Sequence, residues 1–264
     1  MILTKKEDRI LFFLNSFLKL AAILLTISCS SKLNLKLKKN KSKEEKFTYA
    51  DPTGKFSVLR RSGVSSSNDF VTKEELFPYT KWEDPVLEKG IMISSYSKYN
   101  EKVPVLVPKI SQRTFWFDRK KYFSESKFFM KKKEAKFSWR TPSDKKMNKK
   151  VIKLDSERNL YCFFGQLIDC IKETGFLKTS KIKKSGVVYL SIVFDGFPFF
   201  NEQFGILKNG PIIESDFSFE KEMGSGVMRY SLSFLDQKIA YFVDRKGNLI
   251  DKFWISQGLS LKKI

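Results

Sequence analysis

The sequence predicts an α+β fold: a mainly antiparallel sheet of about five or six strands with one amphipathic helix packed on it, after a partly irregular N-terminal region. Three observations support this prediction. Residues 155–175 carry apolar side chains at helical spacing, several later segments alternate apolar and polar residues, and residues 47–116 show little periodicity of either kind. The first two features belong to region 154–264, which we expect to hold the α+β domain.

One segment near the middle of the chain has the spacing of an amphipathic helix. Its apolar residues recur at i, i+3, i+4, i+7, i+8 and i+11, which places them on one face: Leu160, Phe163, Phe164, Leu167, Ile168 and Ile171. Asp155 or Ser156 can cap the first N–H groups, and Gly175 stands where a left-handed residue often ends a helix. We therefore predict a helix in 155–175.

The segments after this helix have the two-residue period of strands. Residues 186–194 and 227–235 place apolar side chains on one face, which indicates an antiparallel sheet covered on one side. Residues 239–255 form two such runs around Gly247-Asn248, a hairpin signal. Two further candidate strands lie in 196–207 and 211–220.

Residues 47–116 read as irregular. The stretch RRSGVSSSND at 60–69 is typical of a loop, and prolines interrupt the segment, among them Pro78, Pro85, Pro104 and Pro108. Short extended pieces such as 90–94 and 103–107 are candidate strands. This segment begins region 47–153, which we expect to be irregular with some β-structure.

Residues 1–28 have the pattern of a secretory signal peptide. Basic residues including Lys5, Lys6 and Arg9 precede an uncharged stretch at 20–28 that ends in small residues. The alternative is a retained transmembrane helix over 10–28. Lys19 disfavours that alternative, because a charge within a span costs a few kcal/mol.

The leader ends at Thr26-Ile27-Ser28-Cys29, which resembles the lipobox of bacterial lipoproteins, with Thr26 in place of the usual leucine. With its many lysines and phenylalanines and its lack of histidine, the chain resembles a spirochaetal (Borrelia-type) lipoprotein. The resemblance implies that Cys29 becomes the first mature residue and carries fatty acyl chains such as palmitate. It also implies a lipid anchor in the cell envelope, at the outer membrane and facing outward. A secretory signal with a chance cysteine is the alternative.

A basic tether follows the cysteine. Residues 30–46 contain seven lysines, two glutamates and no aromatic residue. Such a segment buries too little apolar surface to offset its ordering entropy, so we predict that region 29–46 is a lipidated cysteine followed by a disordered spacer.

A second basic segment, 117–153, carries fourteen basic and four acidic residues with interleaved aromatic residues. The candidate residues for binding a polyanion are Arg119, Lys120, Lys121, Lys131, Lys132, Lys133, Lys136 and Arg140. The alternatives are a solvated face of two strands and a patch that contacts an anionic membrane surface. Aromatic and basic residues together can bind single-stranded nucleic acid, but an exported protein is not expected to meet it.

Two cysteines remain, Cys162 and Cys170. On a single helix they lie about 12 Å apart along the axis, too far for a disulfide bond to each other. We expect two small apolar residues between helix and sheet, with an intermolecular disulfide as the alternative.

Catalytic signatures are missing from the sequence. With no histidine, the chain lacks a Ser-His-Asp triad, a Cys-His pair and an HExxH zinc site, and no nucleotide-binding glycine motif occurs. A glycosidase site would need a pair of carboxylates such as Asp195 with Glu202, but nothing in the sequence distinguishes these two from solvated loop acids. We therefore predict no enzyme activity, no metal and no cofactor.

Three functions remain. The first is a surface-exposed binding protein for a polyanion or a host protein, anchored to the membrane by its acyl chains. The second is a periplasm-facing lipoprotein with a structural or envelope-assembly role. The third, more distant, is a hydrolase that works without histidine.

Overall fold

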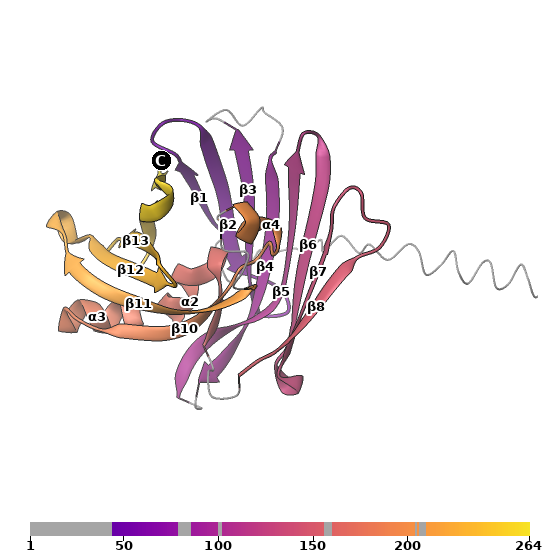
Figure 1. Ribbon diagram of the computed structural model, residues 1–264. Coiled ribbons are helices and arrows are strands. Elements are labelled where there is room, and N and C mark those ends of the chain that lie inside the picture. The colour runs from indigo at the N-terminus through magenta and orange to yellow at the C-terminus, as the bar shows by residue number, and fades with distance from the viewer. Residues whose placement is uncertain (1–43, 79–85, 100–101, 156–159, 204, 206–209) are drawn as a thin grey trace, which may run out of the picture. The chain divides into compact units, whose positions relative to one another are not determined.

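All strands of the folded domain belong to one sheet. The computed structural model describes residues 44–78, 86–99, 102–155, 160–203, 205 and 210–264, and these contain fifteen strands in the order β8-β7-β6-β5-β4-β3-β2-β1-β15-β14-β13-β12-β11-β10-β9 (Figure 1). The prediction of five or six strands with one helix was wrong. Cys29 and residues 30–43 of the predicted tether lie outside the described residues.

The N-terminal half of the sheet consists of eight consecutive antiparallel strands: β1 (Glu45–Ala50), β2 (Phe56–Val64), β3 (Asp69–Pro78), β4 (Glu88–Tyr99), β5 (Val103–Phe117), β6 (Lys120–Phe129), β7 (Glu134–Arg140) and β8 (Asn148–Lys153). A short 3₁₀ helix, η1 (Met130–Lys132), connects β6 to β7. β1 begins inside the segment predicted as the tether.

The prediction that the N-terminal region is largely irregular was therefore wrong. Its alternation is hidden because small polar residues occupy many inward positions: Ser57, Ser62, Thr72, Ser94, Ser111, Ser124 and Ser126 are all buried. The prolines also fit strands here. Pro78 ends β3, and Pro108 pairs with Ser94 where the β4–β5 register shifts, a place that tolerates a residue without an N–H group.

The C-terminal half contains β9 (Tyr161–Phe163), β10 (Val187–Val193), β11 (Ile212–Glu222), β12 (Met228–Phe234), β13 (Gln237–Val243), β14 (Leu249–Trp254) and β15 (Leu259–Lys263). The strands predicted in 186–194, 211–220 and 227–235 are confirmed. The prediction of a strand in 196–207 was wrong, because this segment contains the helix α4 (Phe199–Gln203). Two 3₁₀ helices, η4 (Gly224–Gly226) and η5 (Ile255–Gln257), lie in connections between strands.

The predicted hairpin at 239–255 is confirmed as β13 and β14. Asp244 organises its turn, since its Oδ1 accepts hydrogen bonds from the backbone N–H groups of Lys246 and Asn248, both at 2.8 Å. Gly247 has φ of +82°, a conformation that residues with a Cβ rarely adopt. This turn brings Asn248 and Leu249 to the cavity described below.

The predicted single helix at 155–175 is replaced by three short elements: β9, the 3₁₀ helix η2 (Phe164–Gln166) and α2 (Leu167–Glu173). A further helix, α3 (Phe176–Lys183), follows this segment, and Gly175 is in the left-handed conformation between α2 and α3. The error has a physical source. β9 pairs in parallel with β10 and is buried on both faces, so its sequence is continuously apolar. In the sequence this apolar run is followed directly by the apolar positions of α2, and together they have the spacing of one amphipathic helix.

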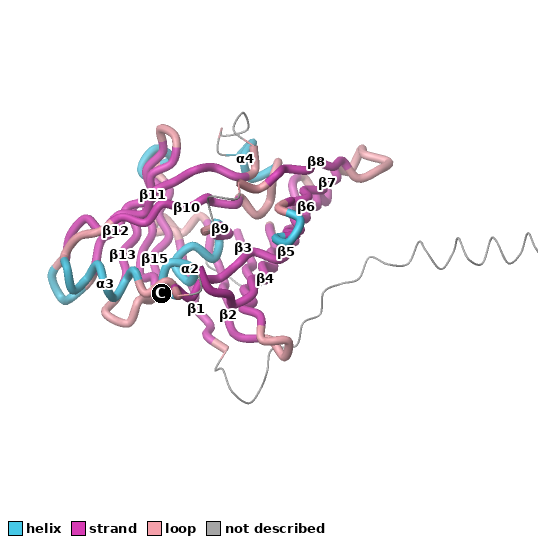
Figure 2. The backbone as a smooth tube through the Cα atoms, turned by 90° about the horizontal axis from the view of Figure 1, so that it is seen from below, coloured by secondary structure: helices cyan, strands magenta, loops and turns pink. Residues whose placement is uncertain are grey.

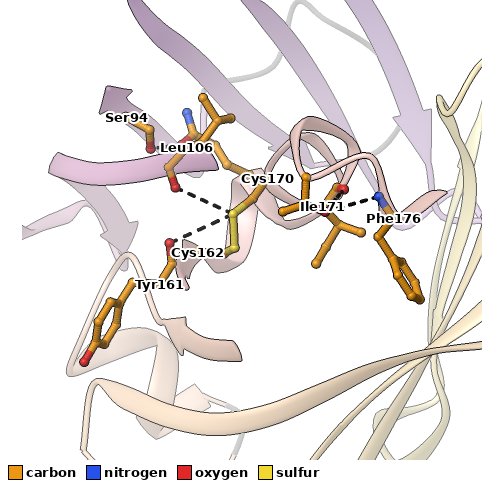
Figure 3. The surroundings of a disulfide bond; sticks show 9 residues. Ser94, Leu106, Tyr161, Cys162, Cys170, Ile171 and Phe176 are labelled. Atoms are coloured by element: carbon orange, nitrogen blue, oxygen red, sulfur yellow. Dashed lines mark hydrogen bonds between the residues drawn. A yellow bond between two sulfur atoms is a disulfide. The ribbon is translucent and has the colours of Figure 1, made fainter. Parts of the chain in front are cut away.

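This break in the helix allows a disulfide bond between Cys162 and Cys170. Cys162 lies on β9 and Cys170 on α2, and their Cα atoms are 6.0 Å apart (Figure 3). The expectation that they could not bridge was wrong, because it assumed one continuous helix. The Sγ atom of Cys170 also lies 3.8 Å from the carbonyl oxygen of Leu106. The bond joins β9 to the helix that packs on the inner face of the sheet.

The two halves of the sheet are joined through β1 and β15, which pair in antiparallel orientation (Figure 2). One core cluster contains α2 and the C-terminal strands, with Ile171, Phe217 and Leu232 fully buried. A second cluster packs β9 and β10 against β4, β6 and β7 through Phe163, Val193 and residues of those strands. The described residues include no helix that is long and apolar enough to cross a membrane.

Candidate functional site

A cavity of about 410 Å³ lies beside α2, between the N-terminal and C-terminal halves of the sheet. Its walls come from the strands β1 to β5 and β13 to β15, and from η2, α2 and α4. The volume is within the range of about 300–1,000 Å³ that is typical of ligand pockets. Apolar side chains make up much of the wall, including Phe47, Tyr49, Val58, Leu76, Leu249, Leu259 and Leu261.

The same cavity contains a network of buried ion pairs centred on Arg113 of β5. Its guanidinium contacts three carboxylates, those of Glu74 at 3.1 Å, Glu88 and Asp195. All four side chains are largely buried. Buried charges require such partners, since an unpaired buried charge is strongly destabilising.

Arg60 of β2 extends the network. Its Nε atom lies 3.3 Å from Glu74, and its Nη2 atom contacts Asp169 on α2 and donates to the carbonyl oxygen of Gly165 at 3.3 Å. Arg60 therefore ties the sheet to η2 and α2. With both arginines in place, each of the four carboxylates named here has a guanidinium partner.

The strand register explains why these groups meet. Arg60 pairs with Glu74 across β2 and β3, Glu74 pairs with Gly90 across β3 and β4, and Gly90 pairs with Arg113 across β4 and β5. Gly90 leaves the space that the arginine needs, because a Cβ atom there would lie 3.0 Å from the Cζ atom of Arg113. The guanidinium can thus reach over Gly90 to Glu74.

Asp195 enters the network from the segment after β10. It accepts a hydrogen bond from the backbone N–H of Gly165 at 3.1 Å as well as from Arg113. Burial raises the pKa of Asp195 and of Glu88 above the usual range of carboxyl groups, and this effect exceeds the opposing effect of Arg113. Glu202, considered with Asp195 as a carboxylate pair in the sequence, is exposed on α4 and makes no ion pair with a described residue.

Lys252 on β14 is a further cation at the cavity wall and, unlike the exposed Lys55 and Lys172, is partly buried. Its Nζ atom lies 4.9 Å from the centre of the Phe164 ring, a cation–π distance. Burial lowers the pKa of this ammonium below its usual value, although Glu74 and Asp195 act in the opposite direction. Neither the arginines nor this lysine stood out in the sequence, because single charged residues on strands give no local signal.

The eight predicted polyanion-binding residues are all exposed, but they form two groups. One group lies at the β5–β6 turn and the end of β7: Arg119, Lys120, Lys121 and Arg140. The other lies at the β6–β7 connection: Lys131, Lys132, Lys133 and Lys136. Lys136 and Arg140, which belong to different groups, lie four residues apart on β7, about 14 Å at roughly 3.4 Å per residue. Binding of a polyanion by either group stays a prediction.

A larger groove of about 790 Å³ lies at the ends of β10, β11 and β12 near α3. Its lining includes Val103, Phe176 and Tyr189, and the described residues around it form no network of buried arginines and carboxylates like that around Arg113. Among the described residues, no group of three or more acidic or cysteine side chains is arranged to hold a metal ion. The smaller cavity is therefore the stronger candidate site.

Comparisons with known proteins show similarity to solved structures but not to a known family. No protein-family model and no curated protein matches the sequence. A solved β-barrel-like protein of the domain of unknown function DUF1849, from Brucella abortus, is similar with a TM-score of 0.44 and 10% sequence identity. The alignment covers 84% of this chain and 94% of that one. At this level the similarity carries no argument about function.

Proposed function

We propose that this chain is a membrane-anchored bacterial lipoprotein whose folded domain binds a small, largely apolar ligand in the cavity beside α2. The observation that carries the binding role is the wall of that cavity, where Phe47, Val58, Leu249 and Leu261 stand near buried charged groups. A mostly apolar pocket with a few convergent polar groups is the usual form of a small-molecule site.

The arginines of the cavity support a binding role rather than a catalytic one. Arg60 and Arg113 are already engaged by carboxylates, so their charges hold the two halves of the sheet and α2 together. This arrangement keeps the cavity walls in place before a ligand arrives. Preformed walls lower the entropic cost of binding.

The anchoring role rests on the leader and on Cys29. The Cys162–Cys170 disulfide supports export, because disulfide bonds persist mainly in oxidising compartments outside the cytosol. We propose that the protein is held at the outer membrane and faces outward. Loss of the protein on protease treatment of intact cells is the expected result. Protection of the protein would instead favour the periplasm-facing alternative.

Leu261→Trp is expected to weaken binding of a neutral apolar fluorophore, N-phenyl-naphthylamine, by about tenfold or more. The indole would occupy part of the cavity, while an aromatic residue remains well suited to strand β15. Fluorescence titration of the purified domain measures the affinity. The matched control is Lys262→Trp, which adds the same side chain at an exposed neighbouring position. Equal affinities for the two variants, or no binding to the wild type, would refute the binding role.

Cys29→Ala is expected to abolish membrane anchoring. Two or three acyl chains on Cys29 would hold the protein stably in a bilayer, at roughly 0.8 kcal/mol per buried CH₂ group. The wild type should enter the detergent phase of a Triton phase separation, and the variant the aqueous phase. Ser30→Ala is the control and should behave as wild type. A mature wild-type protein that still begins at Met1 would contradict the proposal.

A further inference from the structure

Lys252 differs from the other buried cations of the cavity. Arg60 and Arg113 each contact two or more carboxylates, whereas no carboxylate oxygen of a described residue lies within 4.0 Å of the Lys252 Nζ atom. The lysine is partly buried and lines the cavity. The Nζ atom lies 4.9 Å from the centre of the Phe164 ring, and a ring face compensates only in part for the water that an ammonium loses.

The hydroxyl of Tyr241 also lacks a hydrogen-bond partner among the described residues. Tyr241 is 2% exposed, lines the cavity, and its hydroxyl makes no hydrogen bond to a described residue. Such buried polar groups are costly and rare, so they commonly mark a place where something else binds. Tyr241 and Lys252 are register partners across β13 and β14, which places their side chains on the same face of the sheet as neighbours.

The nearby carboxylates are not available to Lys252. Glu74, Glu88, Asp169 and Asp195 all make contacts with an arginine. Lys252 and Tyr241 therefore offer an ammonium and a hydroxyl donor next to an apolar wall that includes Leu261, the register partner of Lys252 on β15. A ligand that matches this surface carries one anionic group at the end of an apolar chain.

We propose that the cavity binds a single-chain amphiphile with an anionic headgroup, a carboxylate or a phosphate monoester, and that Lys252 and Tyr241 bind this headgroup. This inference rests on the proposed binding function and specifies its ligand class. The headgroup takes the place of the missing carboxylate partner, and the alkyl chain contacts Val58, Leu249 and Leu261. Charge-assisted hydrogen bonds from the ammonium give the anion its preference over a neutral alcohol.

The test is displacement of bound N-phenyl-naphthylamine by four ligands that share one dodecyl chain: dodecanoate, dodecyl phosphate, dodecanol and dodecylamine. All four are used below the concentration at which they form micelles. We expect at least one of the two anions to bind the wild type about tenfold or more tightly than dodecanol, with dodecylamine weakest. The better of the two anions identifies the headgroup.

Lys252→Met should weaken binding of the preferred anion by about tenfold and leave dodecanol within about twofold of the wild type. Tyr241→Phe should weaken the same anion by about threefold through loss of one hydroxyl. Lys262→Met, an exposed lysine on β15, is the matched control and should change neither ligand. Unchanged binding of the neutral fluorophore shows that each variant is folded.

Two results separate the inference from the function on which it rests. If the fluorophore binds but dodecanoate, dodecyl phosphate and dodecanol bind equally, the headgroup site is refuted and the apolar cavity stands. If the fluorophore does not bind the wild type at all, the cavity function itself fails. An anion preference that survives in Lys252→Met also overturns the assignment.

Discussion

Replacing Arg113 by methionine is expected to lower the free energy of unfolding by about 3–5 kcal/mol. The substitution keeps most of the side-chain volume but leaves Glu74, Glu88 and Asp195 buried without their shared guanidinium. Urea denaturation followed by circular dichroism measures the loss as a shift of the midpoint at unchanged slope.

Arg61→Met is the matched control for this prediction. Arg61 lies on β2 beside Arg60, but its ion pair with Glu75 is 3.9 Å long and partly exposed. Exposed pairs of this kind contribute about 0–1 kcal/mol. If Arg113→Met costs no more than Arg61→Met, the buried network does not stabilise the fold.

The loss in Arg113→Met should also depend on pH. The pKa values of Glu88 and Asp195 are raised by burial even with Arg113 present, and removal of the guanidinium should raise them further. In the folded variant these two carboxyl groups then keep protons that the unfolded chain releases above about pH 4. The free energy of unfolding of the variant therefore falls as the pH rises from about 4 through the pKa values that Glu88 and Asp195 have in the folded state. We expect the difference from wild type to be smallest near about pH 5 and to grow toward about pH 8.

Phe194→Ala is expected to cost about 3–5 kcal/mol. Phe194 is 0% exposed, and its ring centre lies 5.3 Å from that of Phe164, 5.5 Å from Phe200 and 5.7 Å from Phe234. The truncation leaves a cavity and removes contacts between η2, α4 and β12. Because Phe164 and Phe200 line the ligand cavity, affinity for the neutral fluorophore should fall together with stability.

Phe253→Ala is the control for this change. Phe253 is 38% exposed on β14, so the same truncation should cost less than about 1 kcal/mol and leave fluorophore binding unchanged. Similar losses for the two variants would mean that the aromatic cluster around Phe194 is not a tightly packed core.

Sequence patterns were most informative where a strand has one apolar face and one polar face. β10, β12 and the β13–β14 hairpin were predicted within a residue or two at their ends, since their period and the Gly247-Asn248 turn are local signals. The same reasoning failed for β2 to β5, where inward serines and threonines conceal the alternation. It failed again at β9, whose buried apolar run cannot be distinguished from a helix by periodicity.

The candidate site was not predictable from the sequence. Its members are single charged residues far apart in the chain: Arg113 and Asp195 are separated by 82 positions, and Arg60 and Asp169 by 109. No local motif connects such pairs. The sequence instead drew attention to the lysine-rich segment 117–153, whose residues the structure places at two ends of β6 and β7.

The sequence by itself determined where several C-terminal strands lie and which histidine-dependent catalytic sites the chain cannot form. It also led to the prediction of a signal peptide that ends before Cys29. Only the tertiary structure decided that β1 pairs with β15, that Cys162 and Cys170 bond, and that Lys252 and Tyr241 stand together at an apolar wall. The reason is physical. Periodicity reports which face of one segment is buried, whereas strand pairing between distant segments selects which buried charges meet and which are left without a partner.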